Sequence, residues 1–219
     1  MKKIGIVLLV AAGILTMGSC GNKSEKVPFD NGDSLGIEVD STLYGICGEA
    51  TSMNMLQMIT DTGDTLMLDI SAAKENDQVF GGMQVGDRMA VLPNDNKTVA
   101  NTVINQTTLL GNWVMPNPID GSDEVGISIK EGGVAESIDQ GSIIYRTWRL
   151  SKGRLEIVLV REGGNDVEEL NVYDILKLTA DSLVYKDAEE TFAYERQKPK
   201  ETYGEDVKLE DSSYDDFKM

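Results

Sequence analysis

The chain contains no histidine among its 219 residues. Nucleophiles activated by an imidazole base and metal sites with imidazole ligands are therefore excluded. The remaining sequence carries no catalytic motif, so we predict that the protein is not an enzyme and uses no cofactor. A hydrolase that works with carboxylates alone is the enzymatic class that stays open.

Basic residues are also scarce, with 20 Lys and Arg against 37 Asp and Glu and a net charge of −17. Contacts to phosphate groups need clustered Lys and Arg, so this balance argues against an anionic membrane surface or nucleic acid as a partner. We therefore predict no nucleic-acid partner.

Only two cysteines are present, and the first of them, Cys20, ends an N-terminal signal. Lys2 and Lys3 give a positive start, residues 4–15 form an apolar run too short for a permanent membrane helix, and small residues precede Cys20. The pattern resembles a bacterial lipoprotein signal, which implies removal of residues 1–19 and acylation of the Cys20 thiol. Each buried methylene of an acyl chain contributes about 0.8 kcal/mol to membrane binding. We therefore expect a protein held in the cell envelope by its N-terminal lipid, in the outer membrane, and facing the periplasm or the cell surface.

With Cys20 acylated, Cys47 has no partner for an internal disulfide, so the fold depends on its core and Cys47 is expected to be a buried, unreactive thiol. The methionines that could offer thioethers to Cu(I) beside it are Met53, Met55, Met58 and Met67. Alternation instead assigns Met53 and Met55 to one core face and Met58 to the opposite face. The acidic stretch 120–124 offers oxygen ligands for calcium without the EF-hand spacing, and we interpret it as a surface turn. We predict no metal site.

The second half of the chain, residues 109–196, is a series of short strand-like segments joined by turns. The eight predicted strands are residues 113–115, 125–130, 133–138, 143–150, 154–160, 169–178, 182–186 and 191–196. Apolar residues alternate within them, as in Leu155, Ile157 and Leu159, which is typical of half-buried strands. The links carry Gly, Asn and Asp, and such short turns favour antiparallel neighbours. Eight antiparallel strands can close into a barrel whose interior holds side chains or one small ligand.

Two short motifs mark the ends of this barrel, Gly111-Asn112-Trp113 in its first strand and Tyr194-Glu195-Arg196 in its last. Together with the meander of strands, they resemble the lipocalin-like domains common in lipoproteins of Bacteroidetes. The resemblance implies that Trp113 forms the floor of the barrel and packs under Arg196. A guanidinium over an indole face is worth about 0.5–2 kcal/mol, which gives this pairing a physical basis. It also implies that the barrel binds a small apolar or amphipathic molecule.

The fourth predicted strand carries the candidate ligand-binding residues, Tyr145, Trp148 and Arg149. Alternation places Tyr145 and Arg149 on one face of the strand, and Arg146 and Trp148 on the other. Whichever pair faces inward would line a cavity with an aromatic wall and a cationic group. The alternative is that these side chains only fill and solvate the barrel.

The first half of the chain, residues 35–108, predicts a smaller β unit. Its strand candidates are residues 41–49, 52–60, 65–71, 88–92 and 99–106, with a helical turn near residues 72–77. Five strands with one interruption resemble a small OB-like or SH3-like barrel. The predicted fold class is therefore all-β, with an eight-stranded antiparallel lipocalin-like barrel at 109–196 preceded by this small barrel. The alternative is one larger sheet system that contains all thirteen strands.

The segments outside the two predicted barrels carry few apolar residues. We interpret residues 20–34 as a flexible tether and residues 197–219 as an acidic disordered tail. Together, these features predict a lipid-anchored, non-enzymatic envelope protein that binds a small apolar or amphipathic ligand in its C-terminal barrel. The alternative is an interaction or sensor module in envelope assembly, with a filled barrel whose surface contacts another envelope protein.

Overall fold

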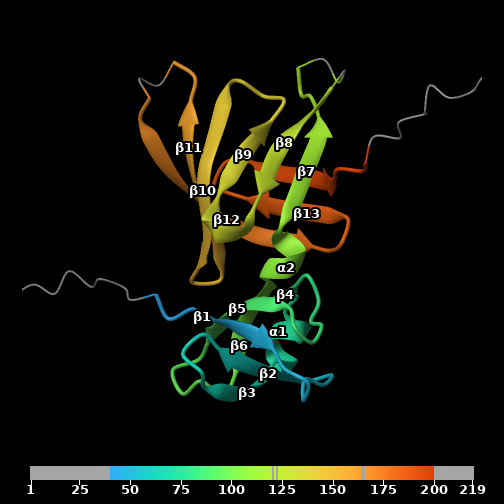
Figure 1. Ribbon diagram of the computed structural model, residues 1–219, viewed down its shortest axis with the longest axis vertical. Helices are drawn as coiled ribbons and strands as arrows, with labels where there is room; N and C mark the ends of the chain where they lie inside the picture. The colour runs from blue at the N-terminus through green and yellow to red at the C-terminus, as the bar shows by residue number, and fades with distance from the viewer. Residues whose placement is uncertain (1–39, 120, 122, 164–165, 200–219) are drawn as a thin grey trace, which may run out of the picture. The chain divides into compact units, whose positions relative to one another are not determined.

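The structure is a computed structural model that describes residues 40–119, 121, 123–163 and 166–199. The described residues all belong to one compact unit. Nearly all of its regular structure is β, in a smaller six-stranded sheet and a larger eight-stranded sheet (Figure 1). Among the described residues, no helix is both long enough and apolar enough to cross a bilayer. The all-β fold class is confirmed.

The smaller sheet has the strand order β3-β2-β1-β5-β6-β4. Its strands are β1 (Leu43–Cys47), β2 (Met55–Thr60), β3 (Thr65–Asp69), β4 (Val79–Phe80), β5 (Arg88–Pro93) and β6 (Ala100–Asn105). All neighbours are antiparallel except β4, which pairs parallel with β6 and was not predicted. Helix α1 (Ser71–Glu75) follows β3, where the sequence predicts a helical turn.

The smaller sheet curls back on itself. A parallel bridge joins Asp69, the last residue of β3, to Val99, immediately before β6. The Asp69 backbone N–H also donates to the Thr98 carbonyl at 2.9 Å. These contacts bring the end of β3 beside the start of β6, so the smaller unit is a strongly curved mixed sheet. Its interior holds a separate apolar core that includes Leu56, Met58, Leu68 and Met89.

Cys47 and Met58 face each other in this core as register partners on β1 and β2, and both are buried. The prediction of a buried thiol at Cys47 agrees with this position. Met55 and Met58 lie on opposite faces of β2, as predicted, but the predicted core face was wrong, because Met58 is in the core and Met53 is 78% exposed. The reason is that β2 begins only at Met55, so Met53 lies before the strand and does not follow its alternation.

The larger sheet has the order β10-β11-β12-β13-β14-β7-β8-β9, and all of its neighbouring strands are antiparallel. Its strands are β7 (Gly111–Pro116), β8 (Glu124–Ile129), β9 (Ala135–Ile138), β10 (Ile143–Ser151), β11 (Arg154–Arg161), β12 (Glu168–Leu178), β13 (Ser182–Lys186) and β14 (Thr191–Arg196). All eight predicted strands are present.

The seam between β9 and β10 brings the two ends of this sheet together. A backbone bridge joins Val134 to Thr147. The Ser137 hydroxyl donates to the Ile143 carbonyl at 2.6 Å and accepts from the Tyr145 backbone N–H at 3.0 Å. These bonds make the sheet a nearly closed barrel, so the predicted eight-stranded barrel is confirmed.

A short helix, α2 (Gln106–Leu109), connects the two sheets. Asn105 caps it, because its side chain accepts from the Thr108 backbone N–H at 2.9 Å. Leu109, at its end, is fully buried in the core of the barrel. The predicted domain boundary near residue 108 therefore falls within this helix.

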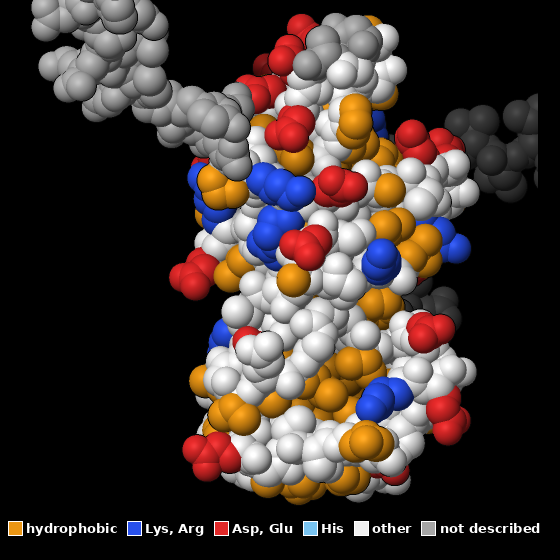
Figure 2. Space-filling view, turned by 90° about the vertical axis from the view of Figure 1, so that its right-hand side faces the viewer, with side chains coloured by type: hydrophobic (Ala, Val, Ile, Leu, Met, Phe, Trp, Pro, Cys, Tyr) orange, Lys and Arg blue, Asp and Glu red, His pale blue; other side chains and the backbone are white. Residues whose placement is uncertain are grey.

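The core of the barrel extends onto the outer face of the smaller sheet. Phe80, Ala90 and Ile104 belong to the same apolar cluster as the barrel residues, and Tyr44 packs against it. The smaller sheet thus buries its inner face in its own core and part of its outer face against the barrel. Figure 2 shows one face of the molecule on which hydrophobic side chains gather over the smaller sheet, whereas charges of both signs are interspersed over the barrel.

Several predictions fall on parts of the chain that are not described. The signal segment 1–19, the acylation site Cys20 and the tether 20–34 lie outside the described residues. The same is true of residues 200–219, which make up most of the predicted tail. The described chain continues from Arg196 through Gln197, whose backbone N–H donates to the Asn112 carbonyl at 2.9 Å.

Candidate ligand-binding cleft

A cleft of about 500 Å³ lies where the smaller sheet meets the barrel. Its lining comes from β1, β5, α2, the turn after β8 and strand β10. Its apolar and aromatic residues are Tyr44, Leu110, Trp148 and Leu150, and its charged and polar residues are Arg88, Gln106, Glu131 and Arg149. Gly132 and Gly133 complete the lining. Apolar walls with a few convergent polar groups, in a volume of a few hundred Å³, are typical of small-molecule sites.

Trp148 forms the aromatic wall of the cleft. Its indole N–H donates to the Lys130 carbonyl at 2.8 Å, which fixes the ring against the turn after β8. The residue is 8% exposed and also belongs to the barrel core. Trp148 therefore separates the interior of the barrel from the cleft.

The predicted alternation along β10 was wrong. A β-bulge between Tyr145 and Thr147 shifts the register against β11, so one residue is added to the strand without a partner. Tyr145 and Trp148 are consequently both buried, whereas Arg146 and Arg149 are both exposed. The bulge thereby brings Tyr145 and Trp148 to the same, inner face, whereas Arg149 lies on the outer face next to Trp148.

Arg149 is held by a cross-strand ion pair. It is the register partner of Glu156 on β11, and its Nε lies 2.5 Å from Glu156 Oε2. The Glu156 side chain is 11% exposed and the Arg149 side chain 68% exposed. The hydrogen bond that Arg149 donates to Glu156 is the main reason why the pKa of Arg149 lies above its ordinary value. The carboxylate of Glu156 is thus largely buried, whereas the guanidinium of Arg149 is exposed and lines the cleft.

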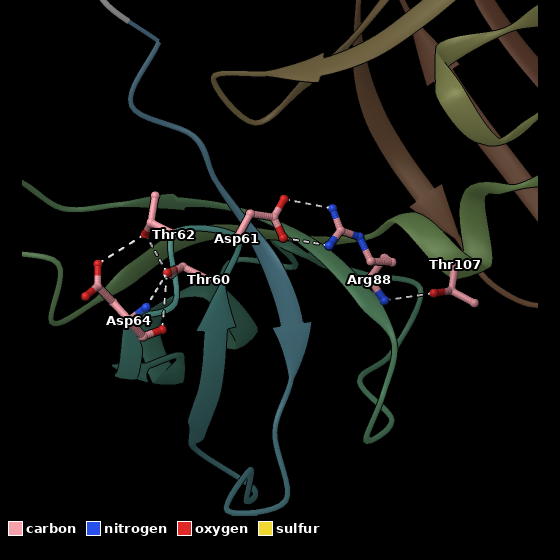
Figure 3. A network of polar contacts seen from close by, with 6 residues as sticks. All are labelled: Thr60, Asp61, Thr62, Asp64, Arg88 and Thr107. Carbon is pink, nitrogen blue, oxygen red and sulfur yellow. Dashed lines mark hydrogen bonds and ion pairs between the residues drawn. The ribbon is translucent and has the colours of Figure 1, made fainter.

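Arg88 supplies the second cation from the smaller sheet. Its Nη1 and Nη2 donate to the two carboxylate oxygens of Asp61 at 2.7 and 2.9 Å (Figure 3). Its backbone N–H donates to the Thr107 hydroxyl of α2 at 2.8 Å. The hydrogen bond from Arg88 holds the pKa of Asp61 below its ordinary value. These contacts fix the arginine between the β2–β3 turn and α2.

Tyr44 lies at the border between the two sheets. Its hydroxyl donates to the Leu150 carbonyl, which ties β1 to the β10–β11 hairpin. The same hairpin is bound by a hydrogen bond from the Lys152 backbone N–H to the Thr42 hydroxyl at 2.8 Å. Burial, followed by the nearby carboxylate of Asp40, raises the pKa of Tyr44 above its ordinary value. Tyr44 is therefore a neutral wall residue whose hydroxyl proton is already donated.

Tyr145, the third predicted ligand residue, does not line the cleft. It belongs to the barrel core together with Tyr173, Tyr185 and Tyr194. The rings of Tyr173 and Tyr185 are 4.7 Å apart, and the hydroxyls of Tyr185 and Tyr194 are 3.3 Å apart. Burial is the main reason why the pKa values of Tyr173, Tyr185 and Tyr194 are raised, to about 12 for Tyr173. The structure therefore separates Tyr145 from the pair Trp148 and Arg149.

The structure brings Trp113 and Arg196 together. The Arg196 guanidinium carbon lies 4.2 Å from the centre of the Trp113 ring system. Arg196 also donates to the carbonyls of Leu110 at 2.9 Å, Thr108 at 2.7 Å and Ala180. Trp113 is fully buried, and its indole N–H donates to the Leu109 carbonyl at 2.8 Å. Trp113 therefore bonds to the Leu109 carbonyl of α2, and Arg196 bonds to the Thr108 carbonyl of α2 and to that of Leu110 after it.

The glycine of the Gly-x-Trp motif has a structural reason in this arrangement. Gly111 has φ of 137°, and a Cβ atom on it would lie 2.2 Å from Arg196 Nη1. A larger residue would therefore both strain the backbone and displace the guanidinium from Trp113. In this motif, Gly111 leaves room for the Arg196 guanidinium and Trp113 provides the ring that it packs against.

Of the ten residues that line the cleft, only Trp148 and Arg149 were predicted. The polar and aromatic ones among the rest are Tyr44, Arg88, Gln106 and Glu131. They come from four different elements and share no local pattern in the sequence. Only the tertiary packing of β1, β5 and α2 against the barrel brings them together. Within the described part of the chain, no three His, Cys, Asp or Glu side chains are placed to hold a metal ion.

Two comparisons with known proteins match part of the chain. The family model described as Lipocalin-like matches residues 105–197. A solved structure, that of a lipocalin-like protein from Bacteroides thetaiotaomicron VPI-5482, is 33% identical in sequence. The alignment covers 41% of this chain and 97% of that chain, with a TM-score of 0.38. None of the curated proteins matches the chain at a significant level.

Proposed function

Residues 105–197 of this chain are a lipocalin-like domain, and from that premise we propose that the protein binds a small apolar or amphipathic molecule in the cleft beside Trp148 and Arg149. The observation that carries the proposal is the cleft itself, whose volume of about 500 Å³ lies in the range of small-molecule sites. Its walls are largely apolar and aromatic, and its two arginines are held by Asp61 and Glu156.

A binding role without catalysis fits the composition. Proteins of lipocalin-like type are generally non-enzymatic binding proteins. The chain has no histidine, and the two arginines of the cleft are engaged in ion pairs that hold them as charged donors. Neither arginine can act as a general base, because a guanidinium stays protonated.

The protein would act at a membrane. We propose that Cys20 carries the lipid anchor and that the domain is held in the cell envelope, at the outer membrane, facing the periplasm or the cell surface. Replacing Cys20 with Ala is expected to abolish acylation and to release the protein from the membrane fraction. Continued membrane residence of that variant would contradict the anchor.

The binding proposal is tested by filling the cleft. Gln106 lines it and is partly buried, so Gln106→Trp should occupy much of the apolar space. Thr191→Trp adds the same ring at an exposed position of β14 outside the cleft and serves as the matched control. Native mass spectrometry of protein from its own host identifies a bound small molecule, which the Gln106 variant should lose and the Thr191 variant should keep.

The outcomes of this test are distinct. Retention of the molecule by the Gln106 variant would place binding elsewhere and overturn the cleft as the site. Repeated preparations of the wild-type protein without any bound small molecule, together with no binding of apolar fluorescent probes, would overturn the ligand-binding function.

A second candidate function rests on the surface of the smaller sheet. Ile46 and Ile59 are register partners on β1 and β2 and are 39% and 44% exposed. An exposed apolar pair on a sheet face is a feature of interaction surfaces. An envelope protein partner would be retained by the wild-type chain and lost by an Ile46→Ser, Ile59→Ser variant that still folds.

A further inference from the structure

We infer that the ligand of the cleft is an anionic amphiphile, a molecule with one carboxylate or phosphate group and an apolar chain, whose anionic group is bound by Arg88 and Arg149. The inference rests on the proposed binding function and goes further by naming the chemical class. It is carried by the placement of the two guanidinium groups relative to their own carboxylate partners.

The first step concerns charge. The chain carries a net charge of −17, yet the lining of the cleft contains two arginines and one acidic residue, Glu131. The carboxylates that pair with the arginines, those of Asp61 and Glu156, do not line it. Each arginine is balanced by its own carboxylate, so the cleft differs from the surrounding surface in the groups that it presents and not in its net charge. The guanidinium groups line the cleft and their carboxylates do not, so N–H donors face a ligand there.

The second step concerns hydrogen-bond donors. Glu156 takes only the Nε of Arg149, and the two terminal nitrogens of Arg149 have no partner among the described residues. Asp61 accepts hydrogen bonds from Nη1 and Nη2 of Arg88. The Nε of Arg88 has no partner among the described residues. A guanidinium that has spare N–H groups in a cleft is suited to carboxylate or phosphate oxygens.

The third step concerns direction. In the Arg149–Glu156 pair, the carboxylate side chain is 11% exposed and the guanidinium side chain 68% exposed. The largely buried carboxylate of Glu156 thus binds Nε of Arg149, and the largely exposed Arg149 side chain lines the cleft. An incoming anion would add a second partner to Arg149 without breaking the first.

The fourth step concerns the rest of the ligand. Leu110, Trp148 and Leu150 supply an apolar wall, and the Tyr44 hydroxyl adds no donor because it already bonds to the Leu150 carbonyl. An ion without an apolar part would leave this wall in water. The combination therefore fits an amphiphile better than a free inorganic anion.

Glu131 provides an internal check. It is exposed and has the same sign of charge as the proposed ligand. If an anion binds in the cleft, Glu131→Gln should tighten binding, because like charges repel. For a neutral ligand, the same change should leave the affinity unaltered.

The experiment measures equilibrium binding by isothermal titration calorimetry to the mature chain with Cys20→Ser, which changes only the acylation site. The ligands are a medium-chain fatty acid, the alkyl phosphate and the neutral alcohol of the same chain length. The variants are Arg149→Gln and the double variant Arg149→Gln, Glu156→Gln, in which no unpaired buried carboxylate remains. Arg146→Gln is the matched control, because Arg146 is exposed on the same strand and does not line the cleft.

We expect the fatty acid or the alkyl phosphate to bind at least about tenfold more tightly than the alcohol. Both Arg149 variants should lose about 3- to 10-fold of that affinity, since the side chain is largely exposed, and Arg146→Gln should lose none. The anion that binds more tightly identifies the head group.

Three results would count against the inference in different ways. Equal affinities of the acid, the phosphate and the alcohol would overturn the anionic class and leave the binding function standing. If the wild type binds none of the three ligands but binds an apolar fluorescent probe that the Gln106→Trp variant does not bind, the inference fails and the binding function stands. If the wild type binds neither the ligands nor the probe, both fail.

Discussion

Arg196 offers the sharpest test of how the barrel is closed at its floor. Its guanidinium donates to three backbone carbonyls and lies 4.2 Å from the Trp113 ring system. Replacement by Met keeps the length and apolar bulk of the side chain and removes all four interactions. The free energy of unfolding should therefore fall by an amount that can be worked out from these contacts.

Hydrogen bonds to charged groups contribute about 1.5–3 kcal/mol each, and half-burial of Arg196 reduces this to about 1 kcal/mol. The cation–π contact adds about 1 kcal/mol. Because these terms share one side chain and are not additive, we expect Arg196→Met to cost about 3–4 kcal/mol. A loss of this size would lower the melting temperature by about 6–16 °C.

The assay is urea unfolding followed by circular dichroism and by tryptophan fluorescence, with a thermal scan as an independent measure. Arg196→Lys keeps the charge but lacks the forked donors, so we expect it to lose about half as much, about 2 kcal/mol. Arg146→Met makes the same change at an exposed position of β10 and should alter stability by less than about 0.5 kcal/mol. A loss below about 1 kcal/mol in Arg196→Met, or a Lys variant as stable as the wild type, would refute this account of the floor.

Three further changes test neighbouring parts of the structure. Gly111→Ala should lower the free energy of unfolding by about 3 kcal/mol, because the added Cβ meets Arg196. In a double-mutant cycle with Arg196→Met, the combined loss should therefore be smaller than the sum of the two single losses, and additive losses would contradict this. The pKa of Tyr173 is raised to about 12 from an ordinary 10.0, so its neutral form stabilises the fold below pH 10.0 and this contribution is lost as the pH rises toward 12. In urea unfolding, the free energy of unfolding should fall by up to about 3 kcal/mol less between pH 10.0 and 12 in Tyr173→Phe than in the wild type. The same fall in both proteins would contradict this. Tyr44→Phe should cost about 1 kcal/mol by the same assay, because the Leu150 carbonyl loses its donor; an unchanged stability would contradict that bond.

The barrel could be predicted from the sequence because each strand carries its own signal. Alternating side chains and turn residues mark β7 to β14 locally, and pairing of successive strands follows from the short turns. Strand β4 could not be found in this way. It has only two residues, Val79 and Phe80, and exists because β6 offers them a parallel partner.

The bulge in β10 shows why the predicted faces of that strand were only partly right. Nothing in the run from Ile143 to Leu150 distinguishes a bulged residue from one that continues the alternation. The register shift depends on how β10 meets β11 and on the seam with β9, which are tertiary facts. As a result, Trp148 and Arg149 were correctly placed on opposite faces of one strand, but Tyr145 was wrongly grouped with Arg149 instead of with Trp148.

The cleft belongs to neither sheet alone. The lipocalin-like match covers residues 105–197, which contain Trp148, Arg149 and Leu110 but neither Tyr44 nor Arg88. The Leu110 side chain lines the cleft while its carbonyl accepts from Arg196, so the floor of the barrel also sets the position of one cleft wall. On the other side, the Arg88 backbone N–H binds Thr107, which fixes the second arginine to the same helix. Helix α2 therefore links the closure of the barrel to Arg88 of the cleft, and the proposed ligand recognition would require the smaller sheet as well as the lipocalin-like domain.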